Sequence, residues 1–237
     1  PALDIRVQCS AFVYSLQMAD AMIRSGQYKR ILLVFSDIQS KFLDLSTTGR
    51  NVSVLFSDGA AALVCESVEC KEEELPTSQN QMSGVIDTIL GSDGSGAALL
   101  QLPSPGSAGP HFLSQEILEN GYWHPKMEGK LVFKHAVTRM CEIAEELIKK
   151  NKINIDDIHC LIPHQANLRI SEAVRERINI SPDKVFNNIQ EYGNTTSATI
   201  PICFAEAIEE GRIKKGSLIL TVAFGAGFTW GGSLIRL

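Results

Sequence analysis

The chain has 237 residues, of which 44% are hydrophobic, so it can bury one large core or two smaller ones. Its formal net charge of -5 argues against nucleic acid as the main partner. No apolar run approaches the ~20 residues that cross a bilayer, and the six cysteines form no CxxC pair. These features favour a soluble cytoplasmic protein without a metal site, a membrane partner or a disulfide scaffold.

The first part of the chain alternates strand patterns with a helix pattern. Strands are predicted over residues 5–7, 31–35, 60–65 and 85–90. The run over 31–35 is apolar throughout, which is typical of a strand covered on both faces. A helix is predicted over 10–25, with Gly26 as its left-handed stop. The charged stretch 66–80 predicts an exposed connection, and the alternation as a whole indicates an α/β fold.

The second part of the chain continues this alternation. Its clearest helix is predicted over 130–150, where an apolar stripe lies opposite charged residues. Shorter helices are predicted over 168–178 and 198–210. Strands are predicted over 159–162, 185–189, 218–223 and 233–237.

Two segments of the chain share one layout. A helix begins beside Cys9 and meets Gly26 17 residues later, and another begins beside Asn194 and meets Gly211, also 17 residues later. An apolar strand follows each glycine. The match indicates two related α/β halves, with Cys9 and Asn194 at equivalent helix N-termini. We divide the chain at the long helix into residues 1–128 and 129–237.

Three polar residues fall where predicted strands meet loops and helices. Cys9 lies at a helix N-terminus, where unpaired N–H groups and the helix dipole favour a thiolate, although a lone cysteine there can also be inert packing. His164 follows a buried strand, and alone it is equally explained by a structural role. Asn194 follows a Tyr-Gly turn, and alone it is better explained as a helix N-cap. Such junctions line the ligand crevice of open α/β sheets. Cys, His and Asn form a nucleophile constellation on more than one fold, so the fold must decide the chemistry.

Five motifs along the chain carry a resemblance to a known family. They are Val-Gln-Cys-Ser-Ala-Phe at 7–12, Phe-Ser-Asp-Gly-Ala-Ala-Ala at 56–62, Pro-His-Gln-Ala-Asn-Leu-Arg-Ile at 163–170, Tyr-Gly-Asn-Thr-Thr-Ser-Ala at 192–198 and Phe-Gly-Ala-Gly-Phe-Thr-Trp-Gly at 224–231. With them the chain strongly resembles β-ketoacyl-acyl-carrier-protein synthase III, the condensing enzyme that starts fatty-acid synthesis. The resemblance implies a thiolase-like fold, layered αβαβα from two pseudo-repeated halves, and a homodimer.

The resemblance also implies a reaction. An acyl group would pass from acyl-CoA to Cys9 and then condense with malonyl-acyl-carrier protein, with loss of carbon dioxide, to give a β-ketoacyl-carrier protein. It implies a catalytic triad of Cys9, His164 and Asn194, and an oxyanion hole made by the backbone N–H groups of Cys9 and Ala226. Coenzyme A enters as part of a substrate, so no separate cofactor is expected.

Further residues match positions with binding roles in the family. The resemblance implies that coenzyme A contacts Arg50, Gly129, Phe133 and Asn167. It also implies that Phe224 gates the acyl pocket and that Arg169 takes part in docking of the carrier protein.

The sequence departs from the family pattern in three places. The usual Cys-Ala-Gly-Phe is Cys-Ser-Ala-Phe, so Ala11 replaces a glycine beside the nucleophile. Residues 66–128 run longer than the pattern, which leaves the acyl-chain preference open. The chain begins at Pro1 without the family's N-terminal portion, so we expect an incomplete first half. The alternatives are a related ketosynthase or acyltransferase of secondary metabolism with another acyl donor, and a non-catalytic fragment that binds acyl-CoA or carrier protein.

Overall fold

The computed structural model describes residues 1–68, 82–107 and 109–237, and its strands form three sheets. Two of them are antiparallel pairs: β1 (Arg30–Asp37) with β2 (Gly59–Glu66), and β4 (Leu100–Gln101) with β5 (Lys126–Met127). The third has the strand order β3-β8-β7-β6, formed by β3 (Gly84–Ser92), β8 (Thr229–Arg236), β7 (Leu218–Gly225) and β6 (Cys160–Pro163). In it β6 and β7 are parallel, and the other pairs are antiparallel.

The helices alternate with these strands along the chain. They are α1 (Ala11–Arg24), α2 (Arg50–Ser53), α3 (Gln115–Glu119), α4 (Gly129–Lys150), α5 (Leu168–Arg177), α6 (Ile189–Tyr192) and α7 (Thr199–Glu209). Short 3-10 turns complete the set: η1 (Gln8–Ser10), η4 (Gly94–Leu99), η5 (Ile155–Asp157), η6 (Pro182–Lys184) and η7 (Thr196–Ala198).

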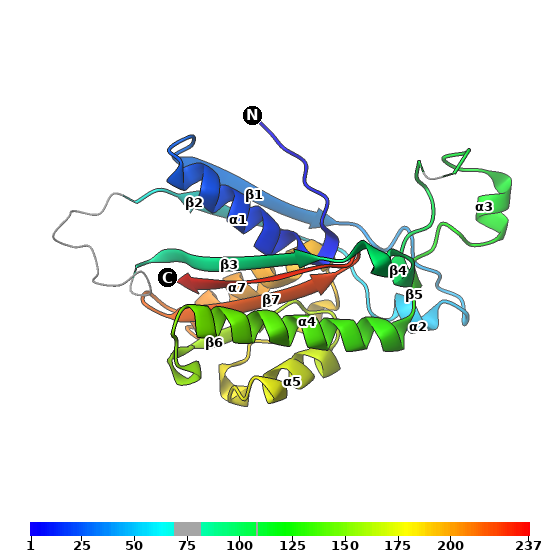
Figure 1. The fold of residues 1–237 in the computed structure, drawn as a ribbon. Coiled ribbons are helices and arrows are strands. Elements are labelled where there is room, and N and C mark those ends of the chain that lie inside the picture. The colour runs from blue at the N-terminus through cyan, green and yellow to red at the C-terminus, as the bar shows by residue number, and fades with distance from the viewer. Residues whose placement is uncertain (69–81, 108) are drawn as a thin grey trace.

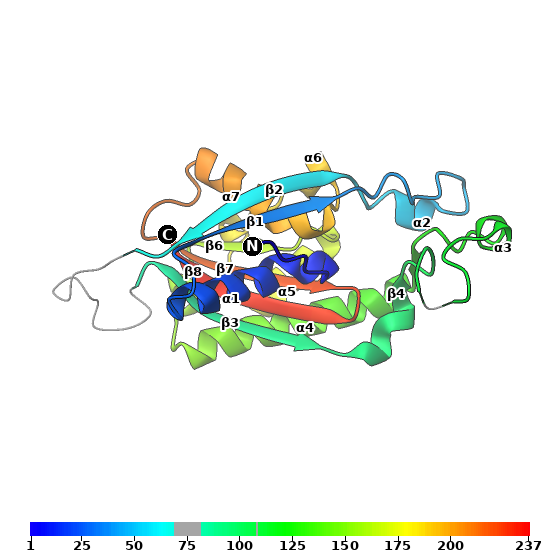
Figure 2. The ribbon, with the colours of Figure 1, turned by 90° about the horizontal axis from the view of Figure 1, so that it is seen from above.

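The elements stack in layers around two hydrophobic clusters. The helices α1 and α7 lie between the β1–β2 pair and the four-stranded sheet, where Phe12 and Leu16 of α1 pack with Phe35 of β1 and with residues of α7 and β7 (Figures 1 and 2). On the other face of the four-stranded sheet, α4 and α5 form the second cluster with β7. Apolar stripes on the helices therefore cover both faces of the four-stranded sheet.

Most of the predicted elements are confirmed. The helices predicted over 10–25, 130–150, 168–178 and 198–210 correspond to α1, α4, α5 and α7, and the strands predicted over 60–65, 85–90, 159–162, 218–223 and 233–237 correspond to β2, β3, β6, β7 and β8. The strand predicted over 5–7 is wrong, because those residues pair with no described strand and a strand needs a hydrogen-bonded neighbour. The strand predicted over 185–189 is reduced to one bridge between Val185 and Leu161. Residues 69–80 of the predicted connection lie outside the described part of the chain.

The strand predicted over 31–35 forms as β1, but the prediction that both its faces are covered is wrong for the described residues. Phe35 is buried against α1, whereas Leu32 and Val34 on the opposite face are 61% and 65% exposed. Successive side chains of a strand point to opposite faces, and no described helix covers the outer face of the β1–β2 pair.

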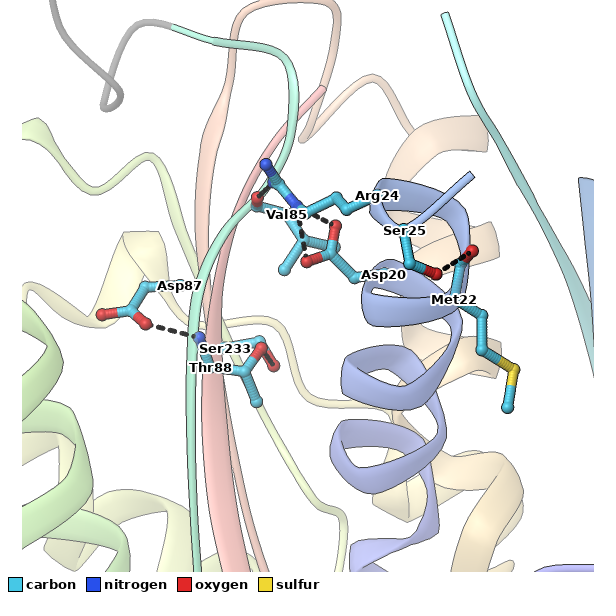
Figure 3. Close-up of polar contacts among 8 residues, drawn as sticks. All are labelled: Asp20, Met22, Arg24, Ser25, Val85, Asp87, Thr88 and Ser233. Atoms are coloured by element: carbon cyan, nitrogen blue, oxygen red, sulfur yellow. Dashed lines mark hydrogen bonds and ion pairs between the residues drawn. The ribbon is translucent and has the colours of Figure 1, made fainter. Parts of the chain in front are cut away.

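The C-terminal end of α1 is tied to β3, the edge strand of the four-stranded sheet (Figure 3). Arg24 pairs with Asp20 one helical turn earlier, with Nε 2.7 Å from Oδ2, and its Nη2 donates to the Val85 carbonyl at 2.7 Å. Farther along β3, the hydroxyls of Thr88 and Ser233 lie 3.0 Å apart and link β3 to β8. The Arg24 contact therefore ties the C-terminal end of α1 to the four-stranded sheet, and η1 with Cys9 precedes the other end of α1.

Within the described ranges, none of the helices combines the length and the apolar character that crossing a membrane requires.

Candidate active site

Cys9 lies in η1, immediately before α1, at a close approach to the end of β7. Cys9 is 7% exposed. Gly225, the last residue of β7, lies against it, so that a Cβ built on Gly225 would stand 2.9 Å from the Cβ of Cys9. On the other side Ser10 Oγ donates to the Thr229 carbonyl at 3.0 Å, which ties η1 to the start of β8. The Cys9 turn is therefore held against the hairpin that contains Ala226.

The electrostatic surroundings of Cys9 differ from the expectation of a thiolate. The pKa of the Cys9 thiol is raised to about 12, mainly because burial disfavours the charged form and secondly because the Asp37 carboxylate is near. A backbone hydrogen bond acts in the opposite direction, but the balance is towards the thiol. Burial therefore keeps Cys9 a thiol at neutral pH.

His164 follows β6 and is 1% exposed. Its backbone N donates to the Val222 carbonyl at 2.8 Å, and its Nδ1 lies 2.6 Å from Oγ1 of Thr199 at the start of α7. Its Nε2 is buried and has no hydrogen-bond partner among the residues that the structure describes. Burial lowers the pKa of the imidazole to about 3, so His164 is neutral near pH 7 and can present Nε2 to a ligand.

Asn194 is 4% exposed and lies in a turn that Gly193 makes possible. Gly193 has φ 68°, and a Cβ there would meet the Leu55 carbonyl at 3.2 Å. The Asn194 side chain accepts a hydrogen bond through Oδ1 from the Thr196 N–H at 2.9 Å. Because Oδ1 is engaged in this way, the side-chain orientation is set, and Nδ2 is the group left to act as a donor.

A chain of hydrogen bonds links the Asn194 turn to His164. Thr196 donates its N–H to Asn194 Oδ1, and its carbonyl accepts from Thr199 Oγ1 at 3.1 Å. Thr199 Oγ1 in turn contacts His164 Nδ1. The structure thus brings His164 and Asn194 into one hydrogen-bonded network at the start of α7, next to the Cys9 turn, since η7 packs on η1.

The internal repeat is present, but its register differs from the prediction. Gln8 and Thr196 both have φ 50° without being glycine, each opens a three-residue 3-10 turn, and an α-helix follows each turn directly. Ser197, rather than Asn194, is therefore the equivalent of Cys9. The equal spacing of 17 residues arises because Asn194 lies three residues before Ser197, while α7 has 11 residues and α1 has 14.

A cleft of about 990 Å³ opens beside Cys9. Cys9 and Ala226 line it together with Asp37, Thr196 and Ser197. Apolar residues of β1 and of the segment between β4 and β5, among them Leu33, Leu102 and Phe112, line the rest. The cleft therefore gives Cys9 an opening to solvent and an apolar wall.

Several predicted site residues lie outside the lining of this cleft. They are His164, Asn194, Arg50, Gly129, Phe133, Asn167, Arg169 and Phe224. Asn167 caps α5, since its Oδ1 accepts from the Arg169 N–H at 2.9 Å, and Arg169 is exposed. Phe224 is 4% exposed, with its ring centroid 4.8 Å from that of Phe228. Arg50 and Gly129 are exposed at the starts of α2 and α4, and Phe133 is 38% exposed one turn into α4.

Sequence reasoning missed three polar residues of the site. Asp37 ends β1 and accepts from both the N–H and the hydroxyl of Ser197, and Thr199 contacts His164. A carboxylate at the end of an apolar strand and the Thr-Thr-Ser-Ala-Thr run after Asn194 were available as signals. Their partners lie far away in the sequence, however, so their roles could not be assigned.

Comparisons with known proteins agree on one family. A family model described as 3-oxoacyl-(acyl-carrier-protein) synthase III matches residues 3–94, and the model of its C-terminal part matches residues 148–237. The chain is 39% identical over 236 residues to a β-ketoacyl-(acyl-carrier-protein) synthase III of Chlorobium phaeobacteroides, covering 99% of this chain and 68% of that protein. The corresponding protein of Koribacter versatilis is 40% identical over 233 residues, covering 98% and 66%.

The fold gives the same result. The crystal structure of the synthase III from Aquifex aeolicus superposes with a TM-score of 0.84 at 38% identity, over 100% of this chain and 67% of that one. The expected fold is thereby confirmed. The chain spans about two thirds of the length of the relatives it matches.

Proposed function

Because the chain belongs to the 3-oxoacyl-(acyl-carrier-protein) synthase III family, we propose that it takes part in decarboxylative condensation of an acyl group with malonyl-acyl-carrier protein. The observation that carries this proposal is the buried, neutral His164, whose unpartnered Nε2 belongs to the same hydrogen-bonded network as Asn194, next to the Cys9 turn. The product would be a β-ketoacyl-carrier protein, the first intermediate of fatty-acid synthesis.

In the first half-reaction Cys9 receives the acyl group. Its sulfur forms a thioester bond with the acyl carbon as the bond from that carbon to the coenzyme A sulfur breaks, and the proton of Cys9 ends on the released coenzyme A thiol. The oxyanion that forms on the way would be stabilised by the backbone N–H groups of Cys9 and Ala226. Both residues line the same cleft, which supports this role.

In the second half-reaction the malonyl group loses carbon dioxide and leaves an enolate. His164 Nε2–H and the Asn194 amide would donate hydrogen bonds to the enolate oxygen, and the enolate carbon then attacks the acyl carbon on Cys9 and releases the Cys9 sulfur. The low pKa of His164 suits this task, because a neutral imidazole does not protonate the carbanion.

The tautomer of His164 matters for this step. Nε2 carries the hydrogen of the neutral ring only when Nδ1 carries none and accepts a hydrogen bond. Thr199 Oγ1 lies 2.6 Å from Nδ1 and 3.1 Å from the Thr196 carbonyl, and its single hydrogen serves one of them at a time. The donor tautomer of His164 therefore requires that the hydroxyl turn from the Thr196 carbonyl to Nδ1. Thr199 would thus orient the ring and select the tautomer that can donate to the enolate.

The remaining partners follow from the same family. We infer that coenzyme A contacts Arg50, Gly129, Phe133 and Asn167, that Phe224 borders the acyl group, and that Arg169 contributes to carrier-protein docking. The protein would act as a cytoplasmic homodimer that needs no separate cofactor. Sedimentation of the purified chain tests the dimer, and a monomer at all concentrations would refute it.

The nucleophile is tested by mass spectrometry of the intact protein after incubation with a panel of acyl-CoAs. We expect a mass increase of one acyl group, located on Cys9 by peptide mapping, and no increase for Cys9→Ala. Cys65→Ala is the matched control, because Cys65 is a half-buried cysteine on β2 outside the cleft lining. A Cys9→Ala protein that is acylated to the same extent would sink the proposal.

A further inference from the structure

Asp37 is the last residue of β1, and it faces η7, the turn that contains Ser197 and corresponds to the Cys9 turn in the repeat. Two residues earlier on β1, the ring of Phe35 packs on Phe12 of α1 with the ring centroids 5.8 Å apart. Asp37 Oδ2 accepts from the Ser197 N–H at 3.1 Å and also from the Ser197 hydroxyl. Because it accepts two hydrogen bonds from Ser197, the Asp37 carboxylate fixes both the backbone and the side chain of that residue.

This arrangement mirrors the one at Cys9. The Cys9 turn packs on Gly225 at the end of β7, and the Ser197 turn packs on Asp37 at the end of β1. In the repeat, a carboxylate thus occupies the place that a glycine takes beside the nucleophile. Cys9, Asp37 and Ser197 line the same cleft.

Asp37 also acts electrostatically on the Cys9 thiol and on the His164 imidazole. Its carboxylate opposes loss of the proton from Cys9 and favours a proton on His164. The turn η7 and the strand β7 carry no titratable side chain, and the acidic and basic residues of α1 pair with each other, Asp20 with Arg24. The remaining titratable residue of α1 is Tyr14, whose hydroxyl donates to the Gly91 carbonyl.

Further charged residues lie on β8 and in the segment before Cys9. On β8 the charged residue is Arg236, at the opposite end of the strand from Thr229. Asp4 and Arg6, which precede Cys9, line the same cleft with opposite charges.

We propose that Asp37 is a positioning residue of this site: it holds the Ser197 turn beside Cys9, and it places a negative charge in the cleft that Cys9 lines, which slows the reaction of the Cys9 sulfur with electrophiles. The inference rests on the proposed function in so far as Cys9 is the nucleophile. A resting nucleophile kept as a thiol resists alkylation and oxidation, because the thiolate is the reactive form.

The test measures the rate at which iodoacetamide alkylates Cys9 between pH 6 and 10, followed by peptide mapping. Asp37→Asn keeps an acceptor for Ser197 and removes the charge. We expect the alkylation rate at pH 8 to rise at least about threefold, because lowering the Cys9 pKa by half a unit raises the thiolate fraction about threefold. Ser197→Ala keeps the charge and removes one hydrogen bond, so its pH profile should match that of the parent protein.

Asp58→Asn is the matched control for removal of a charge. Asp58 also accepts from backbone N–H groups and from a serine hydroxyl, that of Ser40, and it acts on neither Cys9 nor His164. Its alkylation rate should equal that of the parent. If Asp37→Asn fails to fold by circular dichroism, Asp37→Ser provides a second variant without the charge.

Two results would overturn the inference. One is a parent-like pH profile in a folded Asp37 variant, and the other is an equal rise in Asp58→Asn. Alkylation needs neither acyl-CoA nor carrier protein. Failure of the acylation experiment above is therefore distinguishable from failure of this one.

Discussion

Gly225 leaves just enough room for Cys9. A Cβ at Gly225 would come within 2.9 Å of the Cys9 Cβ and 3.1 Å of its backbone N, distances at which one of the two turns must move. The hairpin from β7 to β8 carries Ala226, whose N–H we assign to the oxyanion hole. A displacement here therefore changes both the nucleophile and the group that stabilises the oxyanion.

Gly225→Ala should lower the rate of Cys9 acylation by at least about tenfold and destabilise the fold by about 1–3 kcal/mol, because the methyl group is forced into a filled space. Gly94→Ala is the control, since a Cβ on Gly94 would meet nothing within 4 Å. Acylation is followed by mass spectrometry and stability by urea unfolding. Equal acylation rates in the two variants would show that this contact does not position Cys9.

The raised pKa of Cys9 predicts the shape of its pH profile. Because the pKa is about 12, the thiolate fraction at pH 7 to 10 lies on the rising limb of the titration, and alkylation should become about tenfold faster with each pH unit. A small-molecule thiol with an ordinary pKa of about 8.5, measured alongside, should level off by about pH 10. A plateau for Cys9 below pH 9 would contradict the burial argument.

Thr199→Val should separate the two half-reactions. Without the hydroxyl, Nδ1 of His164 loses the group that donates to it, and Nε2 no longer has to carry the hydrogen. We expect condensation with malonyl-acyl-carrier protein to slow by about ten- to a hundredfold, while acylation of Cys9 stays within about twofold of the parent. Thr221→Val, in the buried interior of β7, is the matched control. Equal losses in both half-reactions would point to a purely structural role for Thr199.

The lowered pKa of His164 predicts a loss of stability in acid. Its pKa is about 3 in the folded protein and 6.5 for an unperturbed histidine in the unfolded chain, so below pH 6.5 the unfolded chain binds a proton that the folded chain does not. The free energy of unfolding should therefore fall by about 2 kcal/mol from this group between pH 7 and pH 5. His164→Asn should remove that share of the pH dependence, whereas His111→Asn, at an exposed histidine, should retain it. Urea unfolding at the two pH values measures the difference, and identical slopes for both variants would refute the assignment.

Local sequence was sufficient where the requirement is local. Gly26 was predicted as a left-handed stop, and it has φ 75° with nothing within 4 Å of a Cβ, so the backbone conformation alone calls for glycine. Gly211, at the matching place in the second segment, has φ 70° and equally open surroundings. The long amphipathic pattern of α4 likewise needs only its own residues to be recognised. The motifs placed Cys9, His164 and Asn194 at the ends of elements, where the structure has them.

The charge states and the register of the repeat needed the tertiary structure. Whether Cys9 is a thiol or a thiolate depends on how deeply it is buried and on Asp37, and the register depends on the backbone of Gln8 and Thr196. Likewise, the exposed outer face of β1 follows from what packs on it, which an apolar run cannot reveal.

The sequence by itself therefore determined the family, the order of the elements and the residue types available for chemistry, because these are carried by local patterns and motifs. Only the tertiary structure decided which groups stay protonated, which residue matches Cys9 in the other half, and that Asp37 and Ser197, 160 residues apart, meet beside the nucleophile. Burial and Coulomb interactions act through space, so neighbours along the chain do not disclose them.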